Sequence, residues 1–192
     1  MIKCKVRLLL IFFLGLFSAG VFAQGYPKDF LTHKILVNHD DRTIEAYVKP
    51  VKLNSTIPDR DYYWFSGKQI MNTQGGYGGK PLNGEFKEYD LNKGLRASGV
   101  FLGGLKSGVW KSWRENGKLI EDYTWKLGQK NGTFHKYDSL GKVTEFGEFK
   151  KDLLQGNHTT MIGDSIVKVK YRQGKVVVPK NRMPGFIKRI FK

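Results

Sequence analysis

The sequence predicts an all-β protein built from an array of β-hairpins. Glycines recur at a constant spacing of 24 residues, at Gly84, Gly108, Gly132 and Gly156. A fixed period of this size is typical of a repeat array. Aromatic residues occupy matching places in successive units, and each unit holds two short strands and two turns. That plan leaves no room for a helix.

Residues 1–23 have the three parts of a secretory signal peptide. A basic start precedes an apolar run over residues 8–17, and Val21 and Ala23 stand three and one residues before Gln24. The run is shorter than the roughly 20 apolar residues that span a bilayer. We therefore expect cleavage after Ala23 and a periplasmic or extracellular product, with an uncleaved anchor as the alternative. Cys4, the single cysteine, lies inside this signal.

The chain is strongly basic, with a formal net charge of +16. The predicted signal carries three of these charges and no acidic residue, which leaves +13. Such a charge favours association with polyanions: anionic lipid, anionic glycan or an acidic protein. Nucleic acid is a less suitable partner for an exported chain. The alternative is a solvated lysine surface with no particular partner.

Residues 24–59 precede the repeats. Segments 35–37 and 43–48 read as two strands around a turn-prone stretch, and we expect them to form a short hairpin that caps the array. Residues 50–58 read as a linker. Tyr62 opens a degenerate first unit.

The repeat array is predicted over residues 60–178, with units near 60–83, 84–107, 108–131, 132–155 and 156–178. In the third of these, a strand over 108–113, a turn at Asn116-Gly117 and a strand over 119–126 follow one another. Asn-Gly tolerates the positive φ that two-residue hairpin turns need. Stacked units are expected to align their aromatic residues in ladders on one face. The residues with predicted structural roles in the repeat are Gly84, Phe86, Tyr89, Phe101, Gly108, Trp110, Trp113, Asn116, Gly117, Trp125, Gly132, Phe134, Tyr137, Phe149 and Gly156.

The stretch from Gly99 to Trp110 resembles the MORN repeat, in which an aromatic residue, a Gly-Lys turn, a glycine and a second aromatic residue follow one another. The period and the run from Trp110 to Lys118 resemble most the bacterial MORN-variant family, often labelled antitoxin-like, over about residues 62–175. The resemblance implies an elongated single-layer antiparallel sheet that serves as a scaffold, without catalytic residues. Trp110, Phe134 and His158 replace the second glycine of the stricter pattern, so lipid binding is not carried over. A signal peptide also argues against an antitoxin that acts in the cytoplasm.

The C-terminal tail, residues 179–192, has apolar and basic residues at helical spacing. A short amphipathic helix there would suit a membrane surface or a partner, and the alternative is a solvated terminus. The tail residues with predicted surface-binding roles are Arg182, Phe186, Lys188, Arg189, Phe191 and Lys192.

No motif in the sequence predicts catalysis, a cofactor or a metal site. The four histidines, His33, His39, His135 and His158, do not pair with a carboxylate or a second histidine at metal-ligand spacing. The predicted function is an exported, non-enzymatic scaffold that binds a protein in the bacterial envelope. The alternatives are a module for anionic lipid or glycan, an antitoxin or immunity-type protein, and an enzyme whose site is assembled only in space.

Overall fold

The computed structural model describes residues 32–49 and 55–178. These residues form thirteen β-strands and no helix, which confirms the all-β prediction. Since no helix occurs in these two ranges, none there is long and apolar enough to cross a membrane. The predicted signal peptide (1–23) and the C-terminal tail (179–192) lie outside the described residues.

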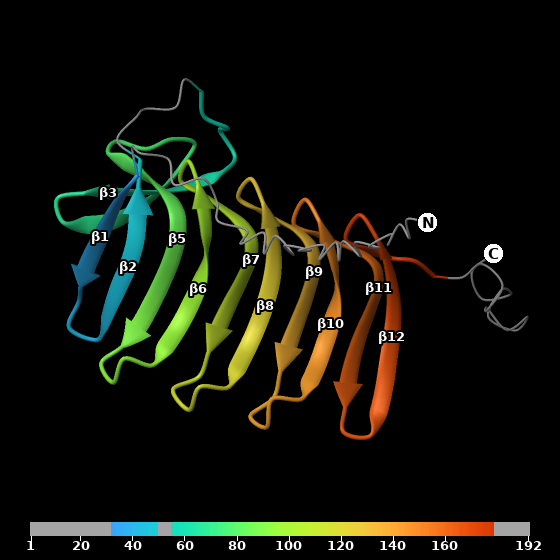
Figure 1. Cartoon of the computed structure of the whole chain (residues 1–192). Coiled ribbons are helices and arrows are strands. Elements are labelled where there is room, and N and C mark those ends of the chain that lie inside the picture. Colours follow the sequence, from blue (N-terminus) through green and yellow to red (C-terminus); the bar gives the residue numbers. More distant parts are fainter. Residues whose placement is uncertain (1–31, 50–54, 179–192) are drawn as a thin grey trace, which may run out of the picture.

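One antiparallel sheet runs the length of the molecule (Figure 1). Its strands follow the order β1-β2-β5-β6-β7-β8-β9-β10-β11-β12-β13, so hairpin follows hairpin along the chain, as the repeat predicts. The strands are β1 (His33–Asn38), β2 (Arg42–Val48), β3 (Asp61–Ser66), β4 (Gln69–Gln74), β5 (Lys80–Asp90), β6 (Leu95–Leu102), β7 (Leu105–Trp113), β8 (Leu119–Lys126), β9 (Gln129–Tyr137), β10 (Val143–Lys150), β11 (Leu153–Ile162), β12 (Ser165–Arg172) and β13 (Lys175–Val176).

The predicted N-terminal hairpin is present as β1 and β2, and it forms the first edge of the sheet. β2 pairs with β5 from Arg42 opposite Asp90 to Val48 opposite Leu82. The hairpin thereby covers the side of β5 that would otherwise be an open edge.

The hairpin β3–β4 is placed differently from a first unit in line with the others. Because β2 and β6 already flank β5, β3 pairs with β5 only at Lys80 and Pro81. The hairpin therefore leaves the path of the sheet and crosses over one face of it (Figure 1). The N-terminal end of the array thus has a second layer, whereas the rest is a single sheet.

The leading glycine of each unit has a positive φ: +123° at Gly84, +66° at Gly108, +130° at Gly132 and +76° at Gly156. L-residues seldom adopt this backbone conformation. The 24-residue spacing of glycines in the sequence therefore reflects a positive φ that recurs once in each repeat unit.

Hydrogen bonds tie each unit to the one before it. At four successive turns, a backbone N–H donates to a carbonyl of the preceding hairpin: Gly104 to Leu82 (2.7 Å), Gly128 to Lys106 (2.9 Å), Asp152 to Lys130 (3.0 Å) and Gly174 to Leu154 (2.9 Å). Side-chain amides add to this connection, since Asn83, Asn131 and Gln155 each accept a bond from a backbone N–H in the next turn of this row. Each of these amides directly precedes a leading glycine, so this role has a local signal in the sequence.

The turn at Asn116-Gly117 differs from the expected two-residue form. The Arg114 N–H donates to the Lys118 carbonyl (2.8 Å), so the loop has three residues, and only Gly117 among them has a positive φ. Asn116 instead accepts a hydrogen bond from the Lys118 N–H (3.1 Å). Three-residue loops with a left-handed last residue are a common hairpin form. Asn116 is thus a side-chain acceptor that stabilises the turn.

The main hydrophobic core lies between the sheet and the β3–β4 hairpin. Its buried residues are Val37, Ile44, Ala46, Val48, Leu82, Phe86, Phe101 and Trp110, and Tyr63, Phe65 and Ile70 of the hairpin pack against them. The N-terminal half of the molecule therefore has a two-layer core of the kind that stabilises small domains.

Candidate interaction surface

The repeated aromatic residues divide between the two faces of the sheet. Phe86 and Trp110 pack on Phe101, at centroid distances of 5.5 and 4.8 Å, and define what we call the aromatic face. Tyr137 lies three residues after Phe134, and successive side chains of a strand alternate, so it lies on the opposite face. By the same alternation, so do Tyr89 and Trp113. The expectation of ladders on one face therefore holds for two of the three aromatic positions of the unit, those of Phe86 and of Phe101. It is wrong for the position of Tyr89, Trp113 and Tyr137, which lie on the opposite face.

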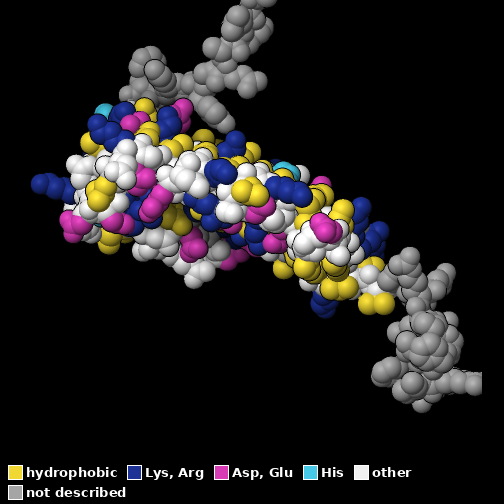
Figure 2. Space-filling model, turned by 90° about the horizontal axis from the view of Figure 1, so that it is seen from below, with side chains coloured by type: hydrophobic (Ala, Val, Ile, Leu, Met, Phe, Trp, Pro, Cys, Tyr) yellow, Lys and Arg dark blue, Asp and Glu magenta, His cyan; other side chains and the backbone are white. Residues whose placement is uncertain are grey.

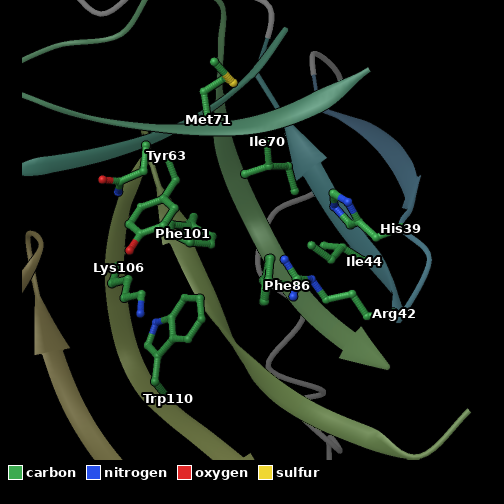
Figure 3. Close-up of a pocket in the computed structure, with 11 residues that line it drawn as sticks. His39, Arg42, Ile44, Tyr63, Ile70, Met71, Phe86, Phe101, Lys106 and Trp110 are labelled. Atoms are coloured by element: carbon green, nitrogen blue, oxygen red, sulfur yellow. The ribbon is translucent and has the colours of Figure 1, made fainter. Parts of the chain in front are cut away.

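The β3–β4 hairpin covers the aromatic face only over its N-terminal half. Tyr63 packs on Phe101 with ring centroids 4.9 Å apart, and Phe101 is 1% exposed. A cavity of about 280 Å³ remains between the two layers. Figure 3 shows Tyr63 and Ile70 of the hairpin above this cavity, and Phe86, Phe101 and Trp110 of the sheet around it.

The C-terminal half of the aromatic face has no such cover among the described residues. We call it the open half and define it by the partly exposed Tyr123, Trp125, Phe149, His158 and Tyr171. Phe134 lies beneath them and is only 1% exposed, because the Tyr123, Phe149 and His158 rings pack on it. Trp125 and Phe149 occupy the position of Phe101 in the next two units, yet both are partly exposed where Phe101 is buried. In the view from below, hydrophobic, basic and acidic side chains are interspersed along the array (Figure 2). This half is where an aromatic surface remains available.

Two lysines cover the open half instead. The Lys106 ammonium lies 4.4 Å from the ring centroid of Trp110 and 5.0 Å from that of Trp125. The Lys130 ammonium lies 3.9 Å from the centroid of Tyr123 and 5.9 Å from that of Trp125. A cation over an aromatic face is attracted by the ring quadrupole. Burial, with a smaller effect from the Lys130 charge, lowers the pKa of Lys106.

Two histidines pair with carboxylates through strand pairing, which the spacing of residues in the sequence does not reveal. On the aromatic face, His158 Nε2 lies 2.9 Å from Glu145 Oε1, and Lys136 donates to the other carboxylate oxygen at 2.8 Å. Burial alone would raise the pKa of Glu145, but the bonds from Lys136 and His158 outweigh it and hold that pKa below its ordinary value. The partners lie on neighbouring strands, so their nearness depends on strand register, which residue spacing does not reveal.

On the opposite face, Asp122 holds a second histidine and a tyrosine. His135 stands directly across from Asp122, with Nδ1 3.0 Å from Oδ1, and the Tyr137 hydroxyl donates to Oδ2 at 2.8 Å. Asp122 is only 9% exposed, and these bonds satisfy its buried carboxylate. The cluster explains why Tyr137 is a structural residue of its unit.

Tyr137→Phe is expected to lower the free energy of unfolding by about 1–2 kcal/mol near pH 8, because Asp122 would lose a buried donor. Burial, followed by the bond to Asp122, raises the pKa of Tyr137 from its ordinary 10.0 to about 12. The neutral phenol therefore stabilises the fold fully below pH 10, and this contribution is lost as the pH rises through about 12. Urea unfolding of both proteins should show their difference shrinking over that range. A difference that does not change with pH would contradict the assignment.

Within residues 32–49 and 55–178, no three His, Cys, Asp or Glu side chains gather where they could hold a metal ion. The six tail residues with predicted surface-binding roles, Arg182, Phe186, Lys188, Arg189, Phe191 and Lys192, lie outside the described residues.

In comparisons with known proteins, no protein-family model, no curated protein and no solved structure matches the chain.

Proposed function

We propose that this chain is an exported, non-enzymatic repeat scaffold that binds a protein partner in the bacterial envelope through the open half of the aromatic face. The proposal rests on a difference in solvent exposure between residues that occupy the same position in successive repeat units. Phe101 is buried by the β3–β4 hairpin, whereas Trp125 and Phe149 in the same repeat position stay partly exposed. Aromatic side chains that remain accessible on a rigid sheet are typical anchors of protein interfaces.

The features of the sequence support export and a scaffold role. Residues 1–23 have the layout of a signal peptide. The resemblance to MORN-variant repeats also belongs to this proposal, and it implies a scaffold without catalytic residues.

The test is co-purification from envelope fractions. Tagged full-length chain and a version that ends at Pro179 are recovered after low-salt and high-salt washes. We expect one defined protein to stay bound at high salt with either version, because an aromatic interface is weakly screened.

A second function, binding to anionic lipid or glycan, is favoured by the net charge of +16. It predicts membrane or glycan attachment that is lost at high salt, or lost without residues 180–192. That result would overturn the scaffold proposal.

A further inference from the structure

The chain itself shows what kind of segment fits the aromatic face. β3 crosses this face, and the Tyr63 ring packs on Phe101 while the Tyr63 N–H donates to the Gly104 carbonyl at 2.8 Å. The segment that covers the face is thus an extended strand that contributes an aromatic side chain and a backbone donor.

The segment that leads into β3 reaches the turn between β8 and β9. There Arg60 Nε of the segment leading into β3 donates to the Leu127 carbonyl at 3.0 Å. A groove of about 210 Å³ lies over strands β6 to β9, and the residues that line it include Lys106, Trp110, Lys111, Tyr123, Trp125 and Lys130. Lys106 and Trp110 also line the cavity under the hairpin, so the groove is next to that cavity.

The groove presents two positive charges that lack an ion-pair partner. Among the described residues, no carboxylate forms a salt bridge with Lys106 or Lys130. Both ammonium groups lie within 6 Å of the Trp125 centroid, at 5.0 and 5.9 Å. One carboxylate lines the groove, that of Glu121, so the charge around the two lysines is positive on balance. Charge complementarity therefore favours an acidic occupant.

We propose that this groove binds an extended or hairpin segment of the partner protein that carries an aromatic side chain between two carboxylates on one face of a strand. The aromatic ring would pack on Trp125, and the carboxylates would pair with Lys106 and Lys130. This inference rests on the proposed function and names the chemistry of its partner. The chain's own tail does not fit, because residues 179–192 hold five basic and no acidic residues.

The probe is a cyclic β-hairpin peptide with Glu, Tyr and Glu at alternate positions of one strand, so that all three side chains share a face. Its binding to the full chain is measured by fluorescence anisotropy. We expect saturable binding that weakens roughly tenfold or more when Gln replaces both Glu, and by a similar factor in the double variant Lys106→Gln, Lys130→Gln. Glutamine keeps most of the stem, and circular dichroism checks that the variant stays folded.

The matched control is the double variant Lys118→Gln, Lys142→Gln. Both lysines are exposed, lie at hairpin turns and do not line the groove. This variant has the same net charge as the first, and we expect it to bind the peptide like the wild type. Equal losses in both double variants would show a general charge effect and overturn the proposal, as would equal binding of the Gln peptide.

Two further measurements separate the possible failures. Phosphatidylglycerol vesicles or dextran sulfate that displace the peptide from the groove would assign the lysines to lipid or glycan and overturn the inference. Co-purification with the Lys106→Gln, Lys130→Gln variant tests the site independently. A protein partner retained by this variant would overturn the groove assignment but leave the scaffold function intact, whereas no partner with the wild type would overturn the scaffold function itself.

Discussion

Phe101→Ala should lower the free energy of unfolding by about 3–5 kcal/mol, the largest effect that we expect from a side-chain truncation in this protein. Phe101 is 1% exposed and packs on Tyr63, Phe86 and Trp110 at centroid distances of 4.9, 5.5 and 4.8 Å. Truncation would open a cavity between the two layers, which the sheet cannot collapse to fill. Urea unfolding followed by tryptophan fluorescence gives the change.

Phe149→Ala is the matched control, because the same residue type occupies the same repeat position two units later. Phe149 is partly exposed and no hairpin in the described part of the chain covers it, so its truncation should cost less than half as much. Equal losses at the two positions would show that the hairpin does not bury Phe101 in solution.

Gly132→Ala should destabilise the protein by about 3 kcal/mol, through two effects that add. Gly132 has a φ of +130°, which strains any residue with a Cβ atom. A Cβ there would also lie 2.8 Å from Thr124 Cβ, so the neighbouring strand must shift. Thermal and urea unfolding both measure the loss.

Gly108→Ala separates these effects. Gly108 has a φ of +66°, in the left-handed region, but a Cβ there would meet no atom within 4 Å. Gly108→Ala should therefore lower the free energy of unfolding only through backbone strain, by about 1 kcal/mol. If Gly108→Ala proved as damaging as Gly132→Ala, the contact with Thr124 would not be a determinant of stability.

The sequence allowed the repeat to be predicted because its signals are local. A glycine at each leading position reflects a positive φ at that residue, and alternation within residues 119–126 reflects the two faces of one strand. These properties belong to single residues and near neighbours, so they can be read without knowing which strands pair.

The candidate surface could not be predicted in the same way, because it depends on which strands pair and on which segments compete to pair with β5. β3 is an ordinary strand in sequence, and only the pairing of β2 with β5 displaces it onto the face. His135 lies beside Asp122 because of the register between β8 and β9. Lys106 and Lys130 share one repeat position, two residues before a leading glycine, but the aromatic rings that they lie over include rings on neighbouring strands, which this position alone does not reveal.

The hydrogen bonds between successive turns give the array a direction. Each turn donates to a carbonyl of the hairpin before it, as Gly128 does to Lys106 and Asp152 does to Lys130. A growing chain therefore always finds its acceptors already in place when it folds from the N-terminal end during synthesis. Within this row of turn-to-turn bonds, loss of a C-terminal unit leaves every remaining donor with its acceptor, whereas loss of β5 removes the Leu82 carbonyl to which Gly104 donates. The length of such an array can change by whole units at its C-terminal end without redesign of what precedes them.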